Sequence, residues 1–157
     1  METRTFQVYA SHRQVLLADG YIWKDSDPSS SASFWTRHAF GDRMAVADGM
    51  LGIITGSYGR VNAVLEIHEL EPELDTDGWD HVVEGSLEIT DGELQVASCL
   101  GDEAARVHLE SAWYRVRCSQ AGLVGARDSG GNCPDWYRLQ VWPAAPQAVL
   151  VRKRAAG

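Results

Sequence analysis

Apolar and polar residues alternate with a period of two along most of this chain, which is the pattern of half-buried β-strands. The clearest example is residues 61–67, where the apolar side chains fall on one face and the other face is left for solvent. Further strands, either alternating or wholly apolar, are expected at residues 6–8, 14–18, 50–55, 107–109, 114–118, 136–142 and 148–152. Such short strands separated by turn residues predict an all-β fold, a two-sheet antiparallel β-sandwich of jelly-roll or Greek-key type. We expect it to form one domain over residues 1–157.

The dipeptide Asp91–Gly92 stands between two apolar runs of this alternating pattern. Asp-Gly favours a two-residue type I′ turn, so the flanking runs are expected to pair as a β-hairpin. The register would pair Ile89 with Leu94 and Leu87 with Val96. All four apolar side chains then lie on one face, so the turn chemistry and the hydrophobic pattern agree.

Residues 33–45 depart from the strand pattern. Phe34, Trp35 and Ala39 are spaced loosely like one face of a helix, and Ser33 is a suitable N-cap. A glycine within the segment weakens a helix because of its conformational freedom. We therefore expect one short helix here.

The chain carries no segment typical of membrane insertion or secretion. No apolar run approaches the roughly 18 residues of a membrane span, and the first nine residues are too polar for a secretory signal. Cys99, Cys118 and Cys133 are an odd, widely spaced set without zinc-site spacing, so free thiols are expected. A Cys118–Cys133 bridge would need oxidising conditions. The sequence therefore predicts a cytoplasmic protein without a metal or other cofactor.

Charge is distributed unevenly along the chain. The net charge is −8, and residues 61–105 hold thirteen acidic residues and no Lys or Arg. If these carboxylates gather on one exterior surface, they attract basic proteins and repel nucleic acid phosphates. We therefore expect a non-catalytic inhibitor or immunity-type protein that binds a basic partner such as a nuclease, without direct contact with nucleic acid or membrane. The alternative is that the acids only keep an exposed pair of strands soluble.

The predicted contact residues lie in this acidic stretch and on two outward strand faces. The acidic ones are Glu66, Glu69, Glu71, Glu73, Asp75, Asp77 and Asp80. Trp113, Arg115 and Trp142 join them, because they fall opposite the apolar faces of their strands and Trp and Arg dominate binding hot spots. The alternative for the tryptophans is a core position under a covered sheet.

Two other functions stay open at this point. The Trp and Arg faces could stack on sugar rings, which would make the protein a small-ligand or carbohydrate-binding sandwich. Asp75, Asp77 and Asp80 surround Gly78 like part of a calcium loop, as a calcium-dependent module of the C2 type would require. Their spacing is not that of an EF-hand, and a solvated acidic turn explains them equally simply.

No motif predicts a catalytic residue. Asp128–Ser129–Gly130–Gly131 matches the nucleophile motif of chymotrypsin-like proteases. Those enzymes need a paired β-barrel longer than this chain, and none of the five histidines sits in the context of their catalytic base. The HExxH metal motif and the Walker loop are also absent from the sequence.

One stretch carries a family pattern. Trp35–Thr36, Ala39 and the run Ala45-x-Ala47–Asp48–Gly49, followed by an apolar strand, resemble the corresponding segment of the competence protein J family. The early strand at Phe6–Tyr9 and the later one at Tyr114–Arg117 follow a similar order. The best-known member of this small bacterial family inhibits a DNA-entry nuclease. The resemblance therefore implies a cytosolic inhibitor that binds a nuclease, but no family motif for the inhibitory contact transfers to this chain.

Overall fold

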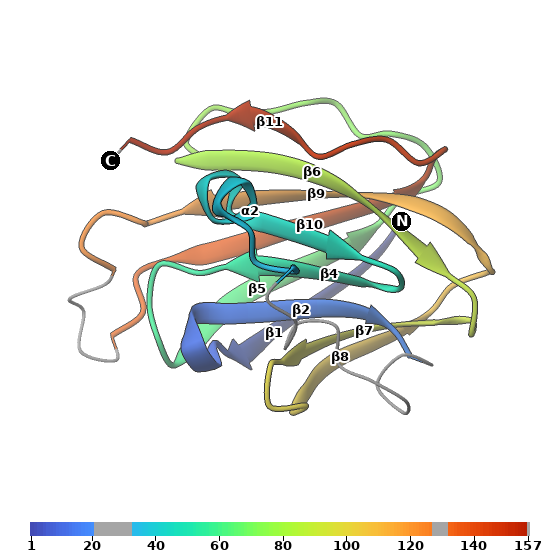
Figure 1. Cartoon of the computed structure of the whole chain (residues 1–157), viewed down its shortest axis with the longest axis horizontal. Helices are drawn as coiled ribbons and strands as arrows, with labels where there is room; N and C mark the ends of the chain where they lie inside the picture. Colours follow the sequence, from blue (N-terminus) through green and yellow to red (C-terminus); the bar gives the residue numbers. More distant parts are fainter. Residues whose placement is uncertain (21–32, 127–131, 157) are drawn as a thin grey trace.

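The computed structural model describes residues 1–20, 33–126 and 132–156, and these residues form two β-sheets packed face to face (Figure 1). Sheet A has six strands, in the spatial order β1 (Glu2–Tyr9), β5 (Arg60–Ile67), β10 (Trp136–Pro143), β9 (Ala112–Ala121), β6 (His81–Ile89) and β11 (Leu150–Lys153). Sheet B has five, in the order β3 (Met44–Ala47), β4 (Met50–Ile54), β2 (Gln14–Asp19), β7 (Glu93–Ser98) and β8 (Glu103–His108). The predicted two-sheet β-sandwich is confirmed.

Strand pairing is antiparallel throughout the described residues except at the centre of sheet A. There β5 and β10 run parallel, with Trp136 opposite Asn62 and Val141 opposite Ile67. Parallel neighbours cannot be joined by a tight hairpin, so this pair depends on a long crossover of the chain. The sandwich therefore departs from the predicted antiparallel arrangement at this one pair.

The inward faces of both sheets meet in one hydrophobic core. Val61 and Leu65 of β5, together with Val116 of β9, are fully buried there, as the alternating pattern predicts. Cys118 follows on the same face of β9, where burial raises the pKa of its thiol to about 12. Cys99 and Cys118 are free thiols, as expected, and Cys118 fills space in the core.

The connection at Asp91–Gly92 joins the two sheets, so the predicted hairpin is wrong. β6 pairs with β9 and β11 in sheet A, whereas β7 pairs with β2 and β8 in sheet B. The carboxylate of Asp19 in β2 accepts hydrogen bonds from the backbone N–H groups of Thr90 at 2.7 Å and Asp91 at 3.0 Å. The four apolar residues of the predicted hairpin still face the core, but they do so from opposite sheets.

The predicted helix is shorter than expected. Helix α2 covers Arg37–Asp42, and its N-cap is Thr36, not Ser33, because the Thr36 hydroxyl accepts a hydrogen bond from the backbone of Ala39 at 3.1 Å. Arg43 ends it in a left-handed conformation with φ 61°, and β3 starts at the next residue. In the described parts of the chain, no helix is both long and apolar enough to cross a membrane.

Candidate functional site

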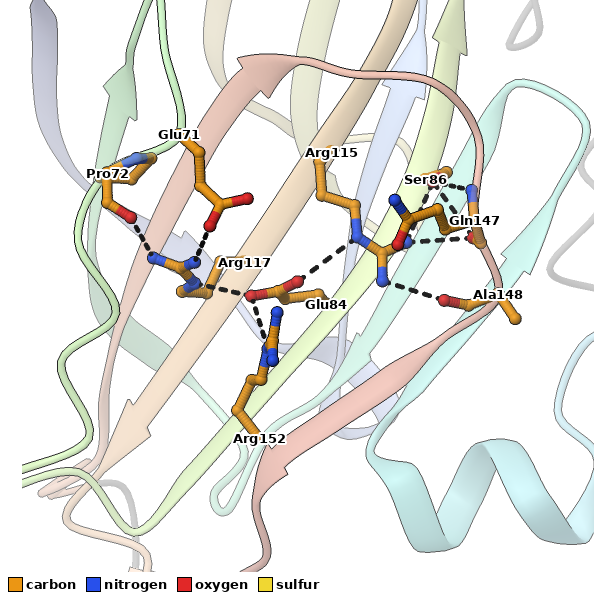
Figure 2. Close-up of polar contacts among 9 residues, drawn as sticks. All are labelled: Glu71, Pro72, Glu84, Ser86, Arg115, Arg117, Gln147, Ala148 and Arg152. Carbon is orange, nitrogen blue, oxygen red and sulfur yellow. Dashed lines mark hydrogen bonds and ion pairs between the residues drawn. The ribbon is translucent and has the colours of Figure 1, made fainter.

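A cluster of buried charges lies on the face of sheet A that points away from sheet B (Figure 2). Glu84 in β6 stands opposite Arg117 in β9, and neither side chain is more than 3% exposed. Arg117 Nε donates to Glu84 Oε2 at 2.8 Å, and Arg115 Nε lies 3.4 Å from Oε1. From β11 on the other side of β6, Arg152 Nε donates to Oε2 at 3.2 Å. One carboxylate therefore binds three guanidinium groups from the two strands that flank it.

The arginines of this cluster stabilise the ionised form of Glu84. Burial alone would raise the pKa of Glu84, but hydrogen bonds and positive charge from Arg117 and Arg152 outweigh burial and hold that pKa below its ordinary value. Arg115 also donates to the carbonyl oxygens of Gln147 at 3.0 Å and Ala148 at 2.9 Å. The arginines predicted to face outward from β9 do so, but other parts of the chain cover them.

The main cover is the segment His68–Asp80, which we call the acidic segment. It connects β5 to β6, and two other strands of sheet A lie between these strands, so it crosses the outer face of the sheet. Arg117 Nη1 donates to the carbonyl of Pro72 at 3.0 Å, and its Nη2 lies 3.8 Å from a Glu71 carboxylate oxygen. Lys153 donates to the carbonyl of Thr76 at 3.1 Å. The middle of the segment is therefore held in place by cations beneath it.

Aromatic rings also pack beneath the acidic segment, beside the arginines. The guanidinium of Arg117 lies 4.9 Å from the ring centre of Trp142. Farther along, Trp79 of the segment itself packs 4.8 Å from the Arg138 guanidinium and 4.6 Å from the ring of Trp136. These cation–π and ring contacts hold the segment through both charge and apolar area.

Both ends of the acidic segment are fixed as well. Before its start, one carboxylate oxygen of Glu66 hydrogen-bonds with His68 at 2.8 Å and Gln140 at 3.1 Å. Burial acts to raise the pKa of Glu66, but these hydrogen bonds outweigh it and lower the pKa. At the other end, Asp80 accepts a hydrogen bond from the backbone N–H of Leu123 at 3.0 Å. The segment therefore has a defined conformation without being a strand or a helix.

The structure separates the ten predicted contact residues into exposed, half-buried and buried groups. The exposed ones are Glu69, Glu71, Glu73, Asp75, Asp77 and Trp113. Glu66 and Asp80 are half-buried at the two ends of the acidic segment. Arg115 and Trp142 are each only 3% exposed, so in this fold they support neighbouring segments from below and present no surface to a partner.

The acidic stretch 61–105 does not form one continuous surface, contrary to the expectation from sequence. Glu84 is buried in its arginine cluster, and Glu93 and Glu103 both pair with Arg106 on sheet B. Glu71 is partly neutralised by its contact with Arg117. Five carboxylates of the acidic segment stay exposed, whereas the exposed Asp91 and Asp102 lie elsewhere in the stretch.

Two exposed apolar residues accompany these carboxylates and were missed from sequence. Leu70 is 81% exposed and Leu74 is 41% exposed, and each lies between acidic neighbours along the chain. An apolar residue flanked by charges on both sides, outside any strand, is the signal that could have identified them. Such side chains offer a partner apolar area within a negative surface.

Two of the three carboxylates of the predicted calcium loop accept hydrogen bonds from the backbone. Asp75 accepts from the backbone N–H of Asp77 at 3.1 Å, and Asp80 points to Leu123. Among the residues that the structure describes, no three His, Cys, Asp or Glu side chains gather in a way that could hold a metal ion. The protease-like motif at 128–131 lies outside the described residues.

Comparison with known proteins identifies the fold. No protein-family model and no curated protein matches this chain. The crystal structure of ComJ from Bacillus subtilis, an inhibitor of the DNA degrading activity of NucA, matches with a TM-score of 0.64 and 15% identity over 92% of this chain and 96% of ComJ. The protein of crocagin biosynthetic gene J matches with a TM-score of 0.54 and 12% identity, over 92% of this chain and all of that one. The resemblance to the competence protein J family therefore holds at the level of the fold, which this chain shares with both proteins.

Proposed function

We propose that this protein is a non-catalytic inhibitor or immunity-type protein that binds a basic protein, with a nuclease as the first partner to test. The observation that carries the proposal is the acidic segment, which presents five exposed carboxylates on a backbone already fixed by Arg117 and Lys153. A segment that is ordered before binding loses little conformational entropy when a partner docks, so more of the contact energy becomes affinity.

The charge pattern of this surface suits a nucleic-acid-binding cleft. Such clefts are lined by Lys and Arg, and a row of carboxylates can occupy the positions where phosphates would lie. Opposite charges speed the encounter of the two proteins, while Leu70 and Leu74 supply apolar contacts once the surfaces meet. The same negative charge disfavours direct binding to nucleic acid, so inhibition would act through the enzyme.

The similarity of fold makes a nuclease a reasonable first choice of partner. ComJ is described as an inhibitor of the DNA degrading activity of NucA, and this chain shares its fold along nearly the whole length of both proteins. The second protein with this fold is named for crocagin biosynthesis, so the fold alone does not specify the partner. The exposed carboxylates of the acidic segment, and not the fold alone, are what favour a nuclease as the partner.

Charge reversal in the acidic segment is expected to weaken inhibition strongly. Glu69→Lys, Glu73→Lys and Asp77→Lys together place three cations opposite a basic cleft, and like charges at an interface cost several kcal/mol, so affinity should fall by roughly 100-fold or more. None of the three carboxylates has a side-chain partner among the described residues, so folding should be retained. The measurement is DNA degradation by a panel of basic nucleases titrated with each variant.

The matched control changes the net charge equally at another place. Asp91→Lys, Asp102→Lys and Glu110→Lys reverse three exposed carboxylates outside the acidic segment. This control should inhibit as the unmodified protein does. Equal inhibition by the two triple variants would exclude the acidic segment as the contact surface, and a panel in which no nuclease binds the unmodified protein would exclude the nuclease.

A groove beside Trp113 favours a second candidate function, the binding of a small ligand such as a sugar. Trp113 is 38% exposed and lines a cavity of about 440 Å³ together with Asp48, Pro146 and Gln147. An exposed indole beside carboxylate and amide groups can stack on a sugar ring while the polar groups bind its hydroxyls.

Intrinsic fluorescence tests this second candidate. A sugar that binds should quench the emission of the unmodified protein, and Trp113→Ala should abolish the saturable change. Trp136→Ala is the control, because Trp136 is also exposed but lies at the far end of the β9–β10 pair. A sugar panel that leaves the spectrum unchanged would dismiss this function.

A further inference from the structure

A cavity lined by arginines lies beside helix α2, apart from every residue of the acidic segment. It has a volume of about 460 Å³, and three arginines, Arg13, Arg43 and Arg154, line it together with His81. Among the described residues, no Asp or Glu side chain lines it. A cavity of this size is within the range that binds small molecules in proteins.

Two of these arginines occupy unusual backbone conformations. Arg13 has φ 58° and Arg43 has φ 61°, and among the described residues only His12, next to Arg13, shares a positive φ without being glycine. A left-handed conformation of a non-glycine residue costs free energy and recurs at sites where a side chain must be aimed at a ligand. Arg13 and Arg43 both line the cavity from these left-handed positions.

The arginines keep donors that protein carboxylates do not occupy. Arg13 Nε is buried and has no hydrogen-bond partner among the described residues. Within the described part of the chain, Arg43 donates to two neutral oxygens, that of the Gln120 side chain at 2.7 Å and the Ile54 carbonyl at 3.2 Å. Both residues are half-buried, so their guanidinium groups are only partly solvated and gain from an anion that joins them.

The surrounding groups leave a positive excess in the cavity. Arg154 forms an ion pair with Asp42 at 2.8 Å, so the charge of Asp42 neutralises one of the three arginines. Asp135 offsets part of the charge of Arg43 through its field, although its own oxygens accept hydrogen bonds from Ser57 and Tyr137 and not from Arg43.

The histidine in the lining does not add to this charge. His81 accepts a hydrogen bond at Nδ1 from the Ala155 backbone N–H at 3.0 Å, while its Nε2 lies 2.8 Å from the Asp42 carbonyl. A ring that accepts at one nitrogen and donates at the other is neutral. The positive excess therefore comes from Arg13 and Arg43.

We propose that this cavity binds a phosphate group, either as the free anion or as the phosphate of a small monoester. Guanidinium groups form paired hydrogen bonds with phosphate oxygens, and two guanidinium groups that are not hydrogen-bonded to a carboxylate suit a phosphate dianion better than a carboxylate monoanion. The cavity is larger than one phosphate, which leaves room for a small organic group attached to it. This binding site is independent of the proposed inhibitor function, since the two use different residues.

Isothermal titration calorimetry at low ionic strength tests the site with three probes: inorganic phosphate, a nucleoside monophosphate and acetate. We expect at least one phosphate probe to bind with a dissociation constant of roughly 1 mM or below, and acetate to bind much more weakly. Tighter binding of the monophosphate than of inorganic phosphate would identify a monoester as the source, and the reverse would identify the free anion. Failure of both phosphate probes, or equal binding of acetate, would overturn the proposal.

Two single variants make the test specific to the cavity. Arg13→Gln removes a guanidinium with no partner to lose and should weaken phosphate binding by roughly tenfold or more without lowering the melting temperature. Arg4→Gln removes the same charge from an exposed position in β1 and should leave binding unchanged. Unaltered binding by Arg13→Gln, or an equal loss in both variants, would overturn the assignment. The triple charge-reversal variant of the acidic segment should still bind phosphate, which separates this proposal from the inhibitor function.

Discussion

Replacing Glu84 with glutamine is expected to lower the free energy of unfolding by about 3–5 kcal/mol, because it leaves buried guanidinium groups without their counterion. Arg117 is fully buried and Arg115 is 3% exposed, so water cannot replace the lost charge. An amide can accept hydrogen bonds at one oxygen only, and its NH₂ group would face an arginine donor. Urea denaturation of the purified variant measures the loss.

Glu88→Gln is the matched control for this substitution. Glu88 lies on the same strand and the same face of β6 as Glu84, but it has no ion pair among the described residues. Its replacement should change the free energy of unfolding by no more than about 0.5 kcal/mol. If Glu84→Gln were as stable as Glu88→Gln, the arginine cluster would not be a major source of stability.

The difference between Glu84→Gln and the unmodified protein should also depend on pH. The pKa of Glu84 is lowered in the folded state, so its contribution to stability is fully present above the ordinary value of 4.5. That contribution is lost as the pH falls below 4.5 and through the lowered pKa of the folded state. The stability of the two proteins should therefore converge in acid, and a gap that stays constant with pH would contradict the assigned charge of Glu84.

Replacing Asp135 with alanine is expected to cost about 3–4 kcal/mol of unfolding free energy, because several buried donors lose one shared acceptor. Asp135 is fully buried and accepts hydrogen bonds from the backbone N–H groups of Gly56 at 3.1 Å and Ser57 at 3.2 Å. The hydroxyl groups of Ser57 and Tyr137 donate to it as well. The carboxylate thus ties the turn after β4 to the start of β10.

A graded control distinguishes this network from a general effect of cavity formation. Tyr137→Phe removes one donor and leaves Asp135 with its other partners, so it should cost only about 1 kcal/mol. Burial and the neighbouring Asp135 charge raise the pKa of Tyr137, so its hydroxyl remains a donor over the pH range in which the protein is studied. Chemical denaturation of both variants and of the double variant gives the coupling energy, and a value near zero would refute the shared network.

The strands were predictable from sequence because the alternation of apolar and polar residues along a strand does not depend on which other strand pairs with it. In β9, Tyr114, Val116 and Cys118 face the core as their alternation predicts. The hairpin at Asp91–Gly92 failed for the same reason, since an apolar face satisfies a sandwich equally well from either sheet. The carboxylate of Asp19, distant in the sequence, accepts hydrogen bonds from the backbone N–H groups of Thr90 and Asp91, and local turn chemistry does not encode this contact.

The acidic residues of the candidate site could be predicted from sequence, but the buried arginines that hold them in place could not. The acidic residues between β5 and β6 were evident from sequence, and five of them are exposed as expected. The burial of Arg115 and Arg117 was not predictable, because alternation places a side chain on a face without showing what covers that face. Here the cover comes from Pro72 and Gln147, which lie more than thirty positions away in the chain.

The parallel pairing of β5 with β10 has a consequence for the order of events during synthesis. β5 leaves the ribosome long before β10, and the strand edge that β10 will occupy stays open throughout that interval. The middle of sheet A can close only when the chain has been translated through Pro143. A nascent chain that stalls earlier therefore leaves this edge of β5 open to pairing with other extended segments.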